Sequence, residues 1–369
     1  MRLSVPFVAL DVQQRLLKPE LMAAVEAVLD GGQFILGQEV ADFEKSFAAL
    51  AGCPAAVGIA SGTCALVLSL RALGIGQGDE VITPANSFVA SAAGVALTGA
   101  RPVFVDVRED LNIDPALIEP AITPRTRAII PVHLTGRPAA MDRIGEIATR
   151  RGLAVVEDAA QAVGARFAGR PIGSFGEIGC FSLHPLKNLG ACGDAGVVTV
   201  RDESLARALR NARNHGLRDR DTCEAWSYNC RLDTLQAAIL NVKLRHLERW
   251  TIAKRRIAAR YRDALAGVVG VPDERPDEFG VYQTFVVRAE RRDDLQRYLA
   301  QRGVDSRIHY PLPLHLQEAA RPLGYRKGDF PVTERLATEI LSLPIYPELA
   351  DAQAEAVIAG VTSFYAGRG

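Results

Sequence analysis

Between residues 55 and 200, short apolar runs alternate with segments of helical character. The runs lie at 55–60, 80–83, 102–105, 128–132, 153–156, 179–183 and 197–200, and helices are expected at 38–51, 64–73, 86–97, 114–121 and 139–151 between most of them. Apolar strands separated by helices are typical of a mostly parallel sheet that is covered by helices on both faces. We therefore expect an α/β fold built around such a sheet.

The rest of the chain extends this core in both directions. Near 267–278 the sequence turns to Gly, Pro and acidic residues, and 369 residues are enough for two domains. We expect a large domain at 1–266 with an N-terminal arm, and a small C-terminal α/β domain at 267–369. Further helices are predicted at 19–29 (with Pro19 in the first turn), 202–213, 231–266, 292–302, 332–341 and 351–365, and strands at 281–288 and 304–309.

Charge and cysteine content exclude several classes of function. Lys+Arg and Asp+Glu both number 43, so no bulk charge favours nucleic acid or an acidic membrane as a partner. No apolar stretch is long enough to span a bilayer. The six cysteines include no Cys-x-x-Cys pair, so we expect neither a metal site nor a disulfide framework, and a reducing cytoplasm as the location.

Polar residues follow several of the predicted strands. Ser61, the stretch 84–88, His133, Asp158 and Ser182 all fall where a strand ends. Ligands of parallel α/β sheets bind at the carboxyl ends of the strands. These positions therefore predict one common site.

Lys187 lies on a short loop between two apolar runs, 179–183 and 197–200. An ammonium group loses hydration when it is buried, which lowers its pKa and makes it a usable amine nucleophile. The alternative is a surface lysine whose amine stays in water.

The turn Ser61-Gly62-Thr63 joins a predicted strand to a predicted helix. Free backbone N–H groups, two hydroxyls and the positive end of the helix dipole would suit a phosphate group. The alternative is that Ser61 or Thr63 only caps the helix.

A nucleophilic lysine, a carboxylate at the end of a buried strand and a phosphate site together suit pyridoxal 5'-phosphate. Lys187 would form the Schiff base, and Asp158 would pair with the pyridine nitrogen. Phe88 could stack on the ring, although core packing is the other explanation for this side chain.

Several longer motifs resemble the DegT/DnrJ/StrS family of sugar aminotransferases, and the resemblance covers nearly the whole chain. The motifs are Ser61-Gly62-Thr63-x-Ala65-Leu66, Pro131-Val132-His133-Leu134, Glu157-Asp158-Ala159-Ala160-Gln161-Ala162, Phe181-Ser182-x-His184-Pro185-x-Lys187-Asn188-Leu189-Gly190, Asn229-x-Arg231-Leu232-Asp233, Tyr310-Pro311-x-Pro313-Leu314-His315 and Leu343-Pro344-x-Tyr346-Pro347.

This resemblance implies a type I, aspartate aminotransferase-like fold and a homodimer with shared active sites. It implies Lys187 as the catalytic residue, and Gly62, Thr63, Phe88, Asp158, Gln161, Ser182 and Asn229 as cofactor-binding residues, with Gln161 near the ring hydroxyl, Ser182 on the phosphate and Asn229 reaching the phosphate of the neighbouring subunit. Phe34, His309, Tyr310 and His315 are the implied substrate-pocket residues.

The resemblance also implies glutamate as amino donor and a nucleotide-linked keto-sugar as acceptor, for amino-sugar biosynthesis. The stretch Asn188-Leu189-Gly190 with Gly193-Asp194-Ala195-Gly196 is similar to members that aminate the third sugar carbon. We therefore expect a 3-keto-6-deoxy-hexose. A fourth-carbon acceptor, an unusual long sugar or a cyclitol stays open, as does a non-catalytic regulator that binds the cofactor.

Overall fold

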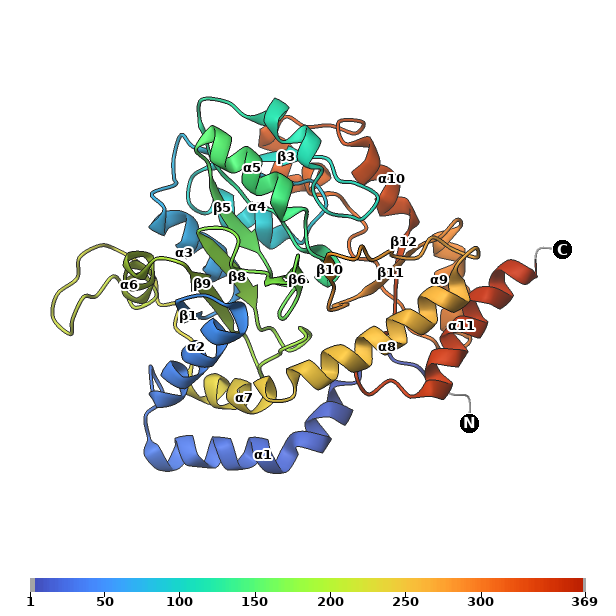
Figure 1. Cartoon of the computed structure of the whole chain (residues 1–369), viewed down its shortest axis with the longest axis horizontal. Helices are drawn as coiled ribbons and strands as arrows, with labels where there is room; N and C mark the ends of the chain where they lie inside the picture. Colours follow the sequence, from blue (N-terminus) through green and yellow to red (C-terminus); the bar gives the residue numbers. More distant parts are fainter. Residues whose placement is uncertain (1–3, 368–369) are drawn as a thin grey trace.

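The computed structural model describes residues 4–367, and a seven-stranded sheet forms its centre (Figure 1). The strand order is β1-β9-β8-β5-β4-β2-β3. Strand β9 is antiparallel to both of its neighbours, β1 and β8. The other adjacent strands of this sheet are parallel. The bounds are β1 Ala55–Ile59, β2 Glu80–Pro84, β3 Arg101–Val105, β4 Thr126–Ile129, β5 Ala154–Asp158, β8 Ile178–Ser182 and β9 Gly196–Val200. The predicted α/β class with a mostly parallel sheet is confirmed.

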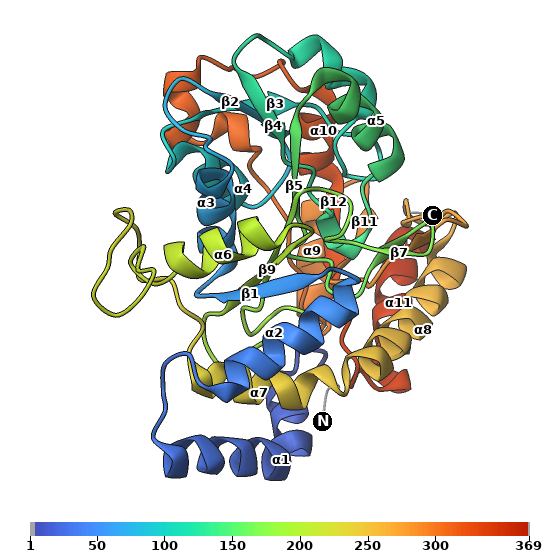
Figure 2. The same ribbon diagram turned by 60° about the vertical axis from the view of Figure 1, so that its left-hand side comes forward.

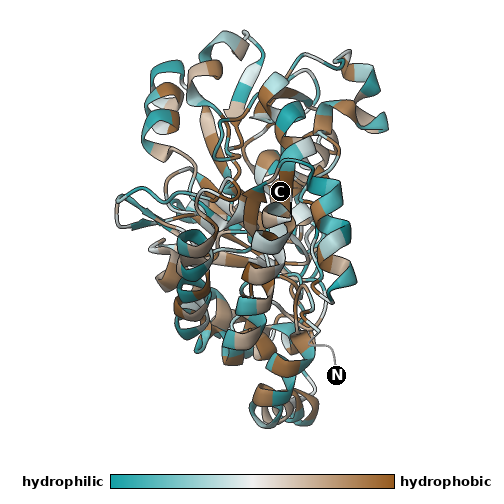
Figure 3. Cartoon of the chain, turned by 90° about the vertical axis from the view of Figure 1, so that its right-hand side faces the viewer, coloured by the Kyte–Doolittle hydropathy of each residue, from teal (hydrophilic) through white to brown (hydrophobic). Residues whose placement is uncertain are grey.

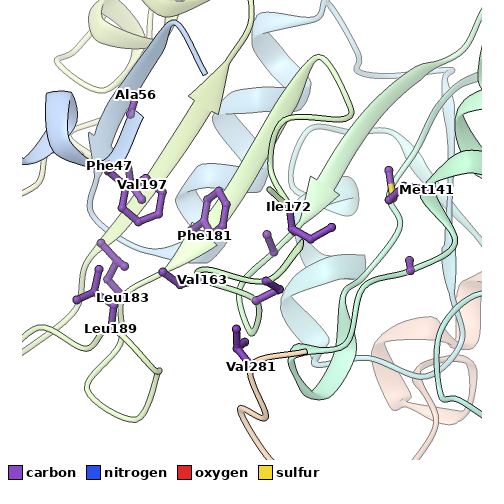
Figure 4. Close-up of a cluster of buried hydrophobic side chains, with 14 of the residues drawn as sticks. Phe47, Ala56, Met141, Val163, Ile172, Phe181, Leu183, Leu189, Val197 and Val281 are labelled. Carbon is purple, nitrogen blue, oxygen red and sulfur yellow. The ribbon is translucent and has the colours of Figure 1, made fainter. Parts of the chain in front are cut away.

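Successive residues of the central strands enter two separate hydrophobic layers, because side chains alternate across a strand. Val155, Phe181 and Val197 pack on one face, and Val156, Cys180 and Val198 pack on the other. The first layer includes side chains of α2 (Gln38–Ala51), α5 (Met141–Arg151) and α7 (Thr234–Leu244), and Figure 4 shows part of it. The second includes α3 (Gly62–Ala72), α4 (Val89–Ala96) and α6 (Glu203–Ala212).

The first helix is longer than the sequence indicates. We expected residues 1–17 to form an arm and Pro19 to begin a helix, but α1 extends over Leu10–Gly31 with Pro19 inside it. A proline inside a helix costs about 3 kcal/mol because it removes a hydrogen bond. Leu17 and Leu21, on either side of the proline, are buried in one apolar cluster with Trp250, and this burial stabilises one continuous helix.

The C-terminal part has its own apolar cluster, which α8 (Leu247–Leu265), α9 (Arg292–Gln301) and α11 (Asp351–Ala366) surround. A two-stranded sheet of β11 (Phe285–Arg288) and β12 (Ile340–Leu343) lies within it, and α10 (Pro331–Glu339) precedes β12. Figure 2 shows this part beside the large sheet, and Figure 3 shows hydrophobic and hydrophilic stretches on the helices of the chain. A third sheet joins β10 (Glu278–Phe279), β6 (Arg166–Phe167) and β7 (Arg170–Pro171).

Four other expectations about elements were wrong. The predicted helix at 231–266 is two helices that break at Arg245–His246, and 114–121 forms two 3₁₀ turns, Pro115–Leu117 and Glu119–Ala121. Residues 304–309 make only isolated bridges, Val304 to Val5 and Arg307 to Ser342. Strand β12 begins inside the predicted helix 332–341, because Ile340 pairs with Arg288 across the chain. Within residues 4–367, none of the helices combines the length and apolar character of a membrane span.

Candidate active site

A cavity of about 430 Å³ lies at the carboxyl ends of the central strands. Ser61, Asp158 and Ser182 line it from the ends of β1, β5 and β8, as the sequence predicted for strand ends. His309 and Tyr310 approach from the C-terminal part of the chain. The wall therefore combines residues that are far apart in the sequence, from Phe7 to Glu348.

His133 does not line this cavity, and neither do residues 84–86 of the strand-end stretch 84–88. The ring is fully buried, and its Nδ1 accepts a hydrogen bond from the Ala139 N–H at 3.0 Å. Its Nε2 therefore carries the hydrogen and donates to Glu157 at 3.2 Å. Glu157 also accepts the backbone N–H groups of Gly173, Phe175 and Gly176. The His133–Glu157 pair therefore has a structural role: it connects the end of β5 to the backbone of residues 139 and 173–176.

Asp158 is only 5% exposed, and both of its carboxylate oxygens have donors. The Ser91 hydroxyl donates to Oδ2 at 2.6 Å, and the N–H of Ala160 donates to Oδ1 at 3.2 Å. Ser87 Oγ lies 2.7 Å from Ser91 Oγ. Ser91 lies in the first turn of α4, and Ser87 immediately precedes the N-cap residue Phe88 of that helix. Ser87 belongs to the strand-end stretch 84–88 that the sequence predicted for the site, whereas our sequence interpretation missed Ser91.

Lys187 lies on the loop between β8 and β9 and lines the same cavity as Asp158. Burial of the amine lowers the pKa of Lys187, and the negative charge of Asp158 partly opposes this shift. A lowered pKa leaves a larger share of the amine unprotonated, which is the nucleophilic form.

The turn at Ser61 caps a helix and also leaves backbone donors at its start. Ser61 Oγ accepts the N–H of Cys64 at 3.1 Å, so this serine caps α3. The N–H groups of Gly62 and Thr63 belong to the first turn, where a helix offers no internal acceptor. A Cβ at Gly62 would lie 2.9 Å from Ser182 Cβ, so the glycine allows the turn to approach β8. These donors and the Ser182 hydroxyl form a cradle that suits a phosphate.

Gln161 and Tyr310 connect the two halves of the wall. Gln161 Oε1 accepts the N–H of Thr135 at 2.7 Å, and its Nε2 donates to the Tyr310 hydroxyl at 3.3 Å. The ring of Tyr310 lies 5.6 Å from that of Phe88, which is half-exposed on the cavity side. A flat ligand could therefore contact aromatic and amide groups together.

His309 lines the cavity near Lys187. Its Nδ1 lies 2.9 Å from Ser342 Oγ. Burial, with a smaller contribution from the Lys187 charge, lowers the pKa of His309 to about 4. The ring is therefore neutral near pH 7.

Three other predicted site residues lie outside the cavity wall. Phe34 and Asn229 are exposed, and His315 is buried with its Nε2 3.0 Å from Glu334 Oε1. The loop after α6, which leads to Asn229, extends away from the body of the subunit in Figures 1 and 2.

The residues at the cavity fit pyridoxal phosphate by the chemistry of their donor set. A hydrogen-bonded carboxylate, an amine with a lowered pKa and a phosphate-like cradle line one cavity. These are the three groups that this cofactor requires of a protein.

Two curated relatives match this chain along nearly its whole length. The dTDP-3-amino-3,4,6-trideoxy-alpha-D-glucose transaminase of Streptomyces venezuelae is 47% identical over 360 residues, which cover 97% of this chain and 95% of the relative. The pleiotropic regulatory protein of Geobacillus stearothermophilus is 43% identical over 368 residues, which cover 98% of this chain and 99% of the relative.

Solved structures also match along nearly the full length. Streptomyces venezuelae DesV superposes with a TM-score of 0.96 at 47% identity, covering 98% of each chain. NtdA of Bacillus subtilis, solved with bound cofactor PMP, gives 0.92 at 31% identity and covers 98% of this chain and 85% of its own.

The sequence profile of the DegT/DnrJ/EryC1/StrS aminotransferase family matches residues 16–362. The chain therefore belongs to the DegT/DnrJ/EryC1/StrS aminotransferase family and is a pyridoxal-phosphate-dependent sugar aminotransferase.

Proposed function

We propose that the enzyme moves an amino group from glutamate to a nucleotide-linked keto-sugar, with a 3-keto-6-deoxy-hexose as acceptor. The observation that carries this proposal is the presence of Lys187 and Asp158 in one cavity, where burial lowers the pKa of the lysine amine. The Streptomyces relative, named for a 3-amino sugar, supports the choice of carbon. The fourth carbon, a long sugar or a cyclitol are the alternative acceptors.

Each residue has a proposed role at a stated atom. Gly62 and Thr63 would donate their N–H groups to the cofactor phosphate, together with the hydroxyl of Ser182. Asp158, oriented by Ser91, would hold a proton on the pyridine nitrogen. Gln161 would lie beside the ring hydroxyl.

The cofactor supplies an electron sink for the carbanion that forms when the substrate loses its α-proton. Lys187 would hold the resting cofactor, and its released amine would then move protons between substrate and cofactor. Phe88 and Tyr310 would exclude water from one side of the ring, and His309 would contact the substrate as a neutral hydrogen-bonding group.

We further propose a homodimer in which Asn229 reaches the cofactor phosphate of the neighbouring subunit, and in which Phe34 and His315 belong to the substrate region. Trp226, on the loop that leads to Asn229, is 92% exposed, which supports a covering partner. We also propose the division into residues 1–266 and 267–369, and a cytoplasmic location, which the six free thiols support.

The test combines colour and turnover. The purified protein with pyridoxal phosphate should absorb in the visible range, and Lys187→Ala should lose this absorbance and amino transfer. A panel of 3-keto and 4-keto nucleotide sugars and a keto-cyclitol, with glutamate as donor, would identify the acceptor. A colourless protein that takes up no cofactor would contradict the proposal.

The name of the Geobacillus relative favours one alternative, a regulator that binds the cofactor without turnover. Nanomolar binding to operator DNA, with no amino transfer to any acceptor of the panel, would support that alternative.

A further inference from the structure

One side chain holds the backbone on both sides of Lys187. Gln283 Nε2 donates to the Leu186 carbonyl at 2.7 Å, and Gln283 Oε1 accepts the Asn188 N–H at 3.0 Å. The two peptide groups that flank the lysine are therefore bound by a single amide, as a neighbouring β-strand would bind them. Donor and acceptor fix the orientation of this amide, because its nitrogen can only donate and its oxygen can only accept.

The side chain of Asn188 extends this contact to Val281 and to helix α8. Its Nδ2 donates to the Val281 carbonyl at 3.0 Å, and its Oδ1 accepts from Lys254 Nζ at 2.7 Å. Lys254 lies on α8 and is 6% exposed. Burial lowers the pKa of Lys254 to about 7, while the Glu348 carboxylate opposes the shift.

Residues 281–284 also contact Thr135 and Gly136, which lie behind the cavity residue Gln161. The Val281 N–H donates to the Gly136 carbonyl at 3.0 Å, and the Thr284 N–H donates to the Thr135 carbonyl at 3.4 Å. Thr135 in turn donates its own N–H to Gln161. The segment therefore sets the distance between the loop of Lys187 and the wall that carries Gln161.

We propose that Gln283, with Asn188 and Lys254, positions the Lys187 main chain so that its amine enters the cavity in one direction. The three residues are positioning residues, because they contact the lysine loop and act through it. This inference rests on the proposed function, since it concerns how Lys187 meets the cofactor. The side chain of Lys187 stays free to move, while its Cα is held both before and after the amine is released.

The first experiment replaces Gln283 by a side chain of similar length that forms neither bond. In Gln283→Met, the visible absorbance of the lysine-bound cofactor should develop at least tenfold more slowly after apoprotein is mixed with pyridoxal phosphate. Affinity for pyridoxamine phosphate, which needs no bond to Lys187, should stay within twofold of the wild type. In steady-state amino transfer, kcat should fall while KM stays unchanged. Gln38→Met, on the exposed surface of α2, is the matched control.

A second variant distinguishes the loss of these two hydrogen bonds from a general disturbance of the structure. In Gln283→Glu the ionised carboxylate repels the Leu186 carbonyl, but the protonated acid can donate to Leu186 and accept from Asn188 as the amide does. The rate of absorbance development, relative to Gln283→Met at the same pH, should rise as the pH falls from about 6 to about 4, because a glutamic acid protonates near its ordinary pKa of about 4.3. Lys187, Lys254, Glu348 and His309 titrate in both variants, so the ratio isolates the new carboxyl.

Two results would overturn the inference. Gln283→Met could react at the wild-type rate, or the ratio for Gln283→Glu could stay flat with pH; the wild type would still be coloured and active, so the proposed function would stand. A wild-type protein that never binds the cofactor would contradict both the inference and the proposed function. If Gln283→Met does not fold, Asn188→Ala and Lys254→Met should show the same slow reaction, and wild-type rates in both would contradict the inference.

Discussion

The hydroxyl of Ser91 donates to Oδ2 of Asp158 over 2.6 Å, from the first turn of α4 to the end of β5. Hydrogen bonds to an ionised group contribute about 1.5–3 kcal/mol. Ser91 therefore stabilises the charged form of the carboxylate that we propose for the pyridine nitrogen.

Two substitutions test this relationship by steady-state kinetics. Asp158→Ala should lower amino transfer by roughly a hundredfold or more, since removing one partner of a buried charge pair costs about 3–5 kcal/mol. Ser91→Ala should lower it by roughly tenfold, in line with one lost charged hydrogen bond. Ser363→Ala, exposed on α11, should leave the rate unchanged. Equal rates for Ser91→Ala and the wild type would contradict the role of the serine.

The close approach of Gly62 to Ser182 gives a prediction about cofactor affinity. In Gly62→Ala the new Cβ would lie 2.9 Å from Ser182 Cβ, so the turn must move away from β8. Overpacking of this kind costs about 1–3 kcal/mol, so the Kd for pyridoxal phosphate should rise by roughly tenfold. Gly145→Ala is the control, because no atom lies within 4 Å of its new Cβ and helix α5 favours alanine. Fluorescence titration of the apoprotein measures both.

His309 should make the apoprotein less stable in acid. Its pKa is about 4 in the folded chain, below the ordinary value, so the unfolded chain binds more protons between these two values. Stability is therefore complete near pH 7 and falls as the pH drops, by about 2–3 kcal/mol near pH 4 from this group. Urea unfolding at both pH values should show a smaller loss in His309→Gln than in the wild type. His184→Gln, on the exposed side of the lysine loop, should behave as the wild type does.

A mixture of two inactive variants tests the shared active site. Lys187→Ala and Asn229→Ala would each disable both sites of their own homodimer. After the subunits exchange, a hybrid dimer has one site with an intact Lys187 and an intact Asn229 from the other subunit. Random pairing in a two-fold dimer should restore roughly a quarter of the wild-type activity. No recovery, with exchange shown by mass spectrometry, would contradict the shared site.

The sequence was most informative where local pattern and tertiary structure agree. Lys187 and Asp158 could be predicted because each follows an apolar strand, and the carboxyl ends of parallel strands meet at one edge of a sheet. The alternation of apolar strands and helices predicted the mostly parallel sheet, because this local pattern persists in the folded chain.

Other features depend on contacts between distant residues and leave no local pattern. Gln283 is 97 positions from Leu186, and nothing near residue 283 indicates that its amide binds there. Ser91 looks like an ordinary helix serine until β5 is placed beside α4. Pro19 stays inside α1 because Leu17 and Leu21 are buried in one apolar cluster with Trp250, a residue more than 200 positions away.

The fit between α3 and the strands has a consequence for enzyme engineering. New Cβ atoms at Gly62 and Gly196 would meet Ser182 and Ser61 within 3 Å, so this end of the cavity has no room for larger side chains. Libraries that aim at new acceptors should leave these glycines unchanged. Randomisation should instead target the half-exposed Phe88 and the neighbouring Tyr310, where a change in side-chain volume alters the cavity without moving a strand.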